Sequence, residues 1–221
     1  MKAGCRIISL VLCLIFILSG TAIASDSAEY ADKLYELGLF RGTETGYELD
    51  RALSREEAVT MIVRLMGVED EVLNAEYNDN FVDVPQTKWS FPYVMYCYEH
   101  GITKGTGADT FSPESIITAR EYTTLILRLL GYEAEPHNAY YIAVEKGMFS
   151  TSKEKEFDTS PLFLRGDMVY ISYRALKTKN ADGIILADIL AENGVITQKQ
   201  AEKFNIYNNT DMEGLLEDLF N

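Results

Sequence analysis

One amphipathic pattern recurs along this chain of 221 residues, and it limits the possible folds more than any other feature of the sequence. The stretch at 54–67, SREEAVTMIVRLMG, returns 64 residues later at 118–131 as TAREYTTLILRLLG. A weaker third copy, LRGDMVYISYRAL, occupies 164–176. The apolar residues of each copy follow the i, i+3, i+4, i+7 spacing that lines one face of a helix. The pattern therefore predicts three equivalent amphipathic helices.

The starts of these helices carry their own signals. Ser54 with Glu57, and Thr118 with Glu121, have the spacing of capping boxes, in which a hydroxyl and a carboxylate satisfy the first free amides. The third copy has Leu164 where the cap hydroxyl would stand, so its start is less well specified. The sequence thus predicts sharp beginnings for the first two helices only.

A second block precedes each copy and indicates a short helix that ends at a glycine: Gly38, Gly101 and Gly147. We therefore expect an all-α protein built of helix-loop-helix units at 25–67, 81–131 and 132–177, with 68–80 as an acidic linker. The rest, 178–221, is a C-terminal extension with short helices predicted at 186–192 and 197–204 and an amphipathic end at 212–220.

The N-terminus, residues 1–24, is typical of an export signal. Lys2 and Arg6 precede a short apolar run, and Ala22-Ile23-Ala24 has the pattern of a cleavage site. An uncleaved anchor helix is the alternative. After cleavage Cys97 would be the only cysteine, so neither a disulfide nor a cysteine-based metal site is expected.

Charge excludes some partners. The formal net charge is -14, whereas phosphate backbones and anionic membrane surfaces require basic faces. We therefore expect no nucleic-acid partner, and no membrane association after signal cleavage. An apolar content of 47% is normal for a globular domain, so the acidity does not indicate disorder.

The second unit resembles an S-layer homology repeat over its whole length. The resemblance rests on Phe81-Val-Asp-Val84, Trp89, Tyr93, Gly101-Ile102, Gly105, Phe111-Ser-Pro113 and Ile117 to Glu121, which follow in the order typical of that family. The first unit lacks the opening block, but its Leu53-Ser-Arg-Glu-Glu57 is the closest match to the family's Thr-Arg-Ala-Glu motif.

This resemblance implies a pseudo-threefold bundle of three repeats with grooves between neighbouring units. It also implies that the grooves bind an anionic secondary cell-wall polymer, often through a pyruvylated sugar, and so hold an exported protein at the cell wall and surface of a Gram-positive bacterium. We expect a cell-wall polysaccharide as the partner, other envelope proteins as further partners, and no cofactor or metal.

Arginine suits such a ligand because its planar fork can bind a carboxylate through two hydrogen bonds. Arg55 and Arg165 align with the motif arginine of the resembled family. Arg120 stands one position later, with Ala119 in the motif place, and one residue turns a helical side chain by about 100°. These three arginines are candidates for ligand binding, with surface or ion-pair roles as alternatives.

The remaining candidates are smaller contributors. Gly42 and Gly105 would let backbone amides approach a ligand or would simply form turns, and Arg41 and Lys104 precede them. Trp89 is either a platform for a sugar ring or, as we favour, a partly buried core aromatic.

Asp83 either accepts from sugar hydroxyls or, as we favour, caps the helix near Trp89. Three arginines late in the predicted helices are interpreted as structural, since a cation there favours the helix dipole: Arg64, Arg128 and Arg174.

Catalysis is not expected. The chain has two histidines and no His-Glu-x-x-His, Gly-x-Ser-x-Gly or phosphate loop. Cys97 and His100 share a predicted helix face, but a small buried thiol is the better interpretation of Cys97. The hypotheses, in order, are a non-catalytic wall anchor, an accessory module that holds envelope proteins, and an enzyme that processes wall glycans.

Overall fold

The computed structural model describes residues 27–206, and the expected signal peptide and the amphipathic end at 212–220 lie outside this range. Within this range, a helix covers 27–36, and every later element is also an α-helix. They are α2 (Arg55–Met66), α3 (Glu69–Asn74), α4 (Phe91–Glu99), α5 (Ala119–Leu129), α6 (Ala139–Glu145), α7 (Thr151–Thr159), α8 (Arg165–Lys177), α9 (Leu186–Glu192) and α10 (Gln198–Ile206). The all-α prediction is confirmed.

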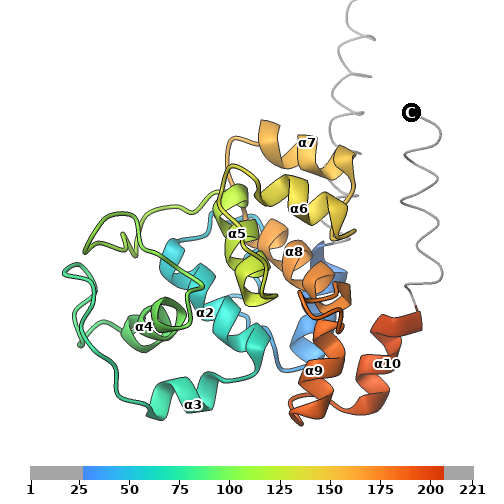
Figure 1. Ribbon diagram of the computed structural model, residues 1–221, viewed down its shortest axis with the longest axis horizontal. Helices are drawn as coiled ribbons and strands as arrows, with labels where there is room; N and C mark the ends of the chain where they lie inside the picture. Colours follow the sequence, from blue (N-terminus) through green and yellow to red (C-terminus); the bar gives the residue numbers. More distant parts are fainter. Residues whose placement is uncertain (1–26, 207–221) are drawn as a thin grey trace, which may run out of the picture.

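The three pattern helices α2, α5 and α8 occupy the middle of the fold (Figure 1). The α5 helix contacts both α2 and α8, while α4 packs on α2 and α6 packs on α5. Tyr122 of α5 is fully buried, and its hydroxyl shares a hydrogen bond of 2.7 Å with the hydroxyl of Ser172 on α8. The core is therefore built from the apolar faces that the repeat predicted.

The predicted starts of α2 and α5 are confirmed. Ser54 and Thr118 accept from the amides of Glu57 and Glu121, whose carboxylates accept from the cap amides in return. At the start of α8, where Leu164 offers no hydroxyl, the Asp167 carboxylate still accepts from the Leu164 amide at 2.9 Å.

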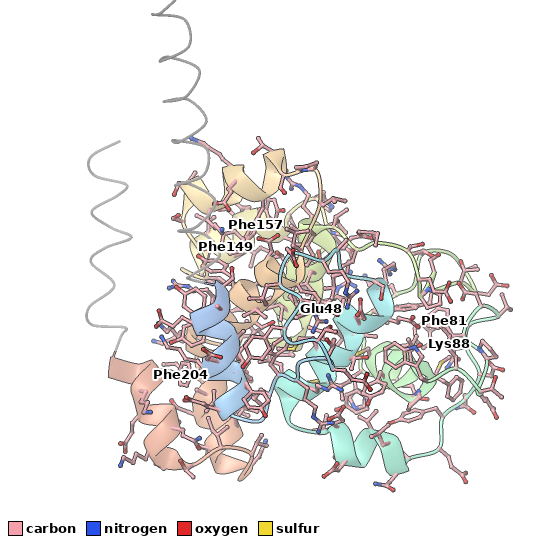
Figure 2. The ribbon with its side chains drawn as sticks, turned by 180° about the vertical axis from the view of Figure 1, so that it is seen from behind. Glu48, Phe81, Lys88, Phe149, Phe157 and Phe204 are labelled. Atoms are coloured by element: carbon pink, nitrogen blue, oxygen red, sulfur yellow. The ribbon has the colours of Figure 1, made fainter. Side chains whose placement is uncertain are left out.

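Two helices were not expected. Residues 68–80, predicted as a linker, contain α3, whose Val72 is fully buried. The loop of the third unit contains α7, which the Ser150 hydroxyl caps by accepting from the Lys153 amide. Phe157 of α7 lies beside Phe149, with ring centroids 5.5 Å apart, so this helix is held by an aromatic contact (Figure 2).

The loops that precede α2 and α5 bend at equivalent positions. Ser112 has φ 59°, so the chain bends within the Phe111-Ser-Pro113 segment. Glu48, 64 positions earlier, has φ 50°. This equivalence extends the repeat from the helices into the loops.

The first and second units are joined by three backbone hydrogen bonds between the start of α2 and the loop before α5. They run from Arg55 to Ser115 (2.9 Å), from Glu56 to Pro113 (3.0 Å) and from Ile117 to Leu53 (3.0 Å). In addition, Nε of Arg55 donates to the carbonyl of Phe111 at 2.9 Å. We call this set the closed junction.

The same closed junction joins the third unit to the first. Its backbone bonds run from Arg165 to Arg51 (2.9 Å), from Gly166 to Leu49 (2.8 Å) and from Leu53 to Phe163 (3.4 Å). Nε of Arg165 donates to the carbonyl of Tyr47 at 3.0 Å. Each acceptor lies at the position equivalent to its counterpart in the other junction.

The junction of the second unit with the third is different. Among residues 27–206, no backbone hydrogen bond joins the first turn of α5 to residues 159–163. A hollow of about 270 Å³ lies there instead. The two junctions that begin with the aligned arginines are closed, and the one that begins with Ala119 is open.

Candidate functional site

Four of the candidate residues meet in one groove, which we call the Trp89 groove. It has a volume of about 210 Å³, and its lining includes Arg41, Gly42, Trp89 and Arg165. The other lining residues are Phe40, Thr43, Glu57, Thr60, Met61, Arg64 and Met168. The groove thus combines the loop and the α2 helix of the first unit, the opening of the second and the start of α8.

Arg41 supplies the most accessible cation of the groove. Its side chain is 60% exposed, and one terminal nitrogen lies 2.7 Å from the Glu69 carboxylate. Arg64 and the Tyr93 hydroxyl bind the other oxygen of Glu69 at 2.8 and 2.9 Å. Glu69 therefore anchors both arginines, and the rest of the Arg41 fork faces solvent.

These contacts shift the pKa of the Glu69 carboxyl. Burial alone would raise its pKa, but the hydrogen bonds from Arg64 and Tyr93 and the charge of Arg41 outweigh burial and lower it. Glu69 is therefore ionised at neutral pH, and Arg64 has the structural role that was predicted while also lining the groove.

Arg165 forms the floor of the Trp89 groove. Its side chain is 9% exposed, its guanidinium lies 5.4 Å from the centre of the Phe40 ring, and one terminal nitrogen lies 3.7 Å from Glu57. Burial lowers its pKa, yet an arginine keeps its proton in proteins. Arg165 therefore places a fixed positive charge under the groove while it closes a junction.

Trp89 is 54% exposed, so the preferred interpretation as a partly buried core aromatic is wrong. One edge contacts Tyr93, with ring centroids 6.2 Å apart and an angle of 61°. Tyr93 holds the indole at the rim of the groove and leaves much of its surface in water. An exposed aromatic face beside cations suits the apolar face of a sugar ring.

The open junction forms a second candidate site, the Arg120 hollow. Its apolar wall includes Ile116, Leu162, Tyr140 and Phe157. Arg120 lies 4.3 Å from the centre of the Tyr140 ring and 2.6 Å from one oxygen of Asp158. The shift of one residue thus directs Arg120 into the junction between the second and third units.

Two backbone donors also remain at this junction. The amides of Ala119 and Arg120 donate to no atom of the described residues, whereas the equivalent amides of α2 and α8 bind neighbouring loops. Amides in the first turn of a helix favour anions. The hollow therefore offers donors and a cation beside an apolar wall.

Arg55 and Asp83 bind the backbone of the buried Phe111, and Gly105 lies beside Thr110 and Phe81, so none of the three lines the Trp89 groove. The Arg55 side chain is 9% exposed and divides its donors between the Phe111 carbonyl and Glu121, which lies 2.8 Å away. Burial lowers its pKa, and the nearby charges of Glu121 and Asp83 oppose that shift. These contacts engage Arg55 in a closed junction.

The preferred capping role of Asp83 at the helix near Trp89 is wrong. Its two carboxylate oxygens accept from the amides of Phe111 and Ser112, at 2.9 and 2.7 Å. Ser112 has positive φ, so the carboxylate binds the backbone at the point where the loop bends. Asp83 thus fixes the loop before α5.

The two candidate glycines differ in their surroundings. Gly105 has φ 77°, and a Cβ there would lie 2.5 Å from the Thr110 carbonyl oxygen and 2.7 Å from the Phe81 ring. Gly42 lines the Trp89 groove, and a Cβ there would lie 3.0 Å from the Gly46 carbonyl oxygen. Gly105 is therefore required by the turn itself, while Gly42 borders the candidate site.

Lys104 repeats the arrangement of Arg41 in the second unit. It forms an ion pair with Glu135, which also accepts from Arg128 at 2.9 Å. Glu135 therefore corresponds to Glu69, and sequence reasoning overlooked both carboxylates. The sequence did contain a signal, since Glu69 follows Gly67 by two positions and Glu135 follows Gly131 by four.

The Cys97 and His100 pair does not form a nucleophile. Cys97 is fully buried, and burial raises the pKa of its thiol, while His100 stacks on Tyr96. Within residues 27–206, no group of three or more His, Cys, Asp or Glu side chains is placed to hold a metal ion. No helix of that part is long and apolar enough to cross a membrane.

Comparison with known proteins agrees with this architecture. Residues 80–121, which include α4 and the cap of α5, match the family model of the S-layer homology domain. The chain therefore contains an S-layer homology domain.

Similar proteins come from several bacteria. The chain is 33% identical to a middle cell wall protein of Brevibacillus brevis over 110 residues, which is 49% of this chain and 10% of that protein. It is 26% identical to a cell surface protein of Thermoanaerobacter kivui over 173 residues, or 76% and 22%. It is 30% identical to an endoglucanase of a Bacillus species over 143 residues, or 58% and 15%. The chain thus spans at most 22% of the length of these relatives.

Proposed function

We propose that this protein is a non-catalytic anchor that binds an anionic polysaccharide of the cell wall. The observation that carries the proposal is the Trp89 groove, where three arginines and an exposed indole meet. Relatives described as cell wall and cell surface proteins support a location at the cell surface.

In the proposed complex, a carboxylate of the polymer, such as that of a pyruvyl group, binds the free part of the Arg41 fork. The Gly42 backbone allows close approach because it lacks a side chain. The sugar ring stacks on Trp89, and Arg165 adds positive charge from the floor. Each contact is weak by itself, so selectivity comes from their combination.

The Arg120 hollow provides a second groove in this proposal. Its carboxylate ligand is held by Arg120 and the two amides at the start of α5, and its sugar by the wall around Tyr140. Two grooves on one chain would raise the apparent affinity for a repeating polymer, because the second contact becomes intramolecular.

We further propose that the units at 25–67, 81–131 and 132–177 form a pseudo-threefold bundle. The support is the equivalence of the two closed junctions, which use the same backbone positions and the same arginine contact. The open junction would be the third junction of the bundle, in which a bound ligand takes the place of the missing backbone hydrogen bonds.

Sedimentation with purified cell-wall sacculi tests the function. The full chain should sediment with intact sacculi and remain in solution when acid has first removed the wall polymer. Equal sedimentation with both preparations, or with neither, would contradict the proposal. A parallel incubation with peptidoglycan and glycan substrates should release no products.

A further inference from the structure

A third hollow lies apart from both candidate grooves, and we call it the lysine hollow. It has a volume of about 580 Å³ and shares no lining residue with the Trp89 groove or the Arg120 hollow. It is lined by Tyr132, Lys146, Lys177, Lys179, Asn180, Ala181 and Gly183. Three cations thus border one hollow of a chain whose formal net charge is -14, and no lining residue is acidic.

The three lysines come from separate elements. Lys146 follows α6, Lys177 is the last residue of α8, and Lys179 begins the loop before α9. Lys177 lies 5.0 Å from the centre of the Tyr173 ring. Lys146 lies 5.4 Å from the centre of the Tyr132 ring and binds Glu145 at 2.9 Å. That contact raises the pKa of Lys146, which keeps its charge at neutral pH.

Lys179 is the least engaged of the three. Its side chain is exposed, and no ion pair joins it to a carboxylate within residues 27–206. A lysine near a helix end often serves the helix dipole, which accounts for Lys146 and Lys177. It does not account for Lys179, which lies beyond Thr178, the C-cap of α8.

The loop that carries Lys179 is fixed by hydrogen bonds. The Asn180 side chain accepts from the amides of Asp182 and Ile184, at 3.0 and 2.8 Å. The Tyr132 hydroxyl donates to the carbonyls of Lys179 and Asn180, at 2.7 and 3.0 Å. The loop is also tied to the end of α5, because the Ala181 amide donates to the Leu130 carbonyl at 2.9 Å. The position of the Lys179 backbone is therefore set before a ligand arrives.

Three ammonium groups suit a phosphate ligand. Each is a compact point charge of the kind that binds phosphate in proteins, and together they match an anion whose charge is spread over several oxygens. The volume exceeds that of a single phosphate group, so a larger phosphate-bearing molecule fits.

We propose that the lysine hollow binds phosphate groups, either of a phosphodiester polymer or of a small free phosphate compound. This site shares no lining residue with the two candidate glycan sites, and it would allow the chain to bind a second kind of anion. Its affinity must fall with salt, because exposed charges are screened over roughly 10 Å at 0.1 M.

The test uses the full chain without its residues 1–24, titrated with inorganic pyrophosphate and with an oligomer of glycerol phosphate. Amide shifts of Ala181 and Gly183 in NMR spectra report binding. The double variant Lys146→Gln/Lys179→Gln should weaken binding at least tenfold. Lys177 is kept because it packs on Tyr173. The charge-matched control, Lys155→Gln/Lys199→Gln, changes two exposed lysines on α7 and α10 and should bind as the unmodified chain does.

Tighter binding of the oligomer would assign the hollow to a polymer, and binding of pyrophosphate alone would assign it to a small compound. The proposal is overturned if neither probe gives a saturable shift at Ala181 and Gly183. It is also overturned if both double variants lose the same affinity, since only net charge would then matter. Matching thermal unfolding of the variants and the unmodified chain shows that each is folded.

Discussion

Nε of Arg165 donates a hydrogen bond to the carbonyl of Tyr47 across 118 residues of sequence, at a distance of 3.0 Å. The equivalent bond from Arg55 to Phe111 joins the other pair of units. The two motif arginines therefore hold neighbouring units together. In Arg165 the same side chain also supplies charge to the candidate glycan site.

The first prediction follows from this structural role. Arg55→Ala leaves the Phe111 carbonyl of a closed junction without its donor and removes the ion pair with Glu121, and should lower the free energy of unfolding by about 2–3 kcal/mol. Arg120→Ala removes an exposed ion pair and a contact with Tyr140 at the open junction, and should cost about 1 kcal/mol or less.

Urea unfolding, monitored by circular dichroism, measures the free energy of unfolding of both variants. Equal losses for Arg55→Ala and Arg120→Ala would show that the two junctions do not differ as described.

The second prediction concerns the turn glycines. Gly105→Ala introduces a Cβ that meets the Thr110 carbonyl and the Phe81 ring at positive φ, and should destabilise the fold by about 2 kcal/mol or more. Gly101 also has positive φ but has open space around it, so Gly101→Ala should cost about 1 kcal/mol. Thermal unfolding distinguishes the two, and a smaller effect at Gly105 than at Gly101 would contradict the described packing.

The third prediction is a loss of stability in acid through Glu69. Its pKa is lower in the folded chain than in the unfolded chain, where a glutamate titrates near about 4.3. The stabilisation is therefore complete above that unfolded value and is lost as the pH falls through the folded value. The midpoint of urea unfolding should fall between pH 6 and pH 3 by less in Glu69→Gln than in the unmodified chain.

The control for this experiment is Glu71→Gln, two residues away on the exposed side of α3. Glu69→Gln should lose more of the acid dependence of unfolding than this control does. If Glu69→Gln keeps the full acid dependence, the contacts with Arg41, Arg64 and Tyr93 do not stabilise the ionised carboxylate.

Much of the fold could be predicted because local signals agreed. The apolar spacing at 54–67 predicts the helix α2, which the structure has. The capping box at Thr118 marks the start of α5, and Gly131, which has positive φ, follows its end. The α3 and α7 helices were missed because their apolar faces are small, with Val72 and Phe157 as the principal buried side chains.

The candidate site was predictable only in part. Arg41, Gly42, Trp89 and Arg165 were named from sequence and do meet in one groove. The spacing of residues could not show that Arg55 and Asp83 are engaged by the Phe111 loop, because that depends on contacts between units distant in sequence. Nor could it show that Tyr93 holds Trp89 at the surface.

The central claim is that the Trp89 groove binds the wall polymer, and calorimetric titration with polymer released from sacculi by acid tests it most directly. The double variant Arg41→Gln/Trp89→Ala changes two exposed groove residues, and its control, Tyr141→Ala/Lys155→Gln, changes an exposed aromatic and an exposed cation elsewhere. The account predicts that the groove variant binds at least tenfold more weakly than the control, which should match the unmodified chain. Equal affinity of the two variants for the polymer would contradict it.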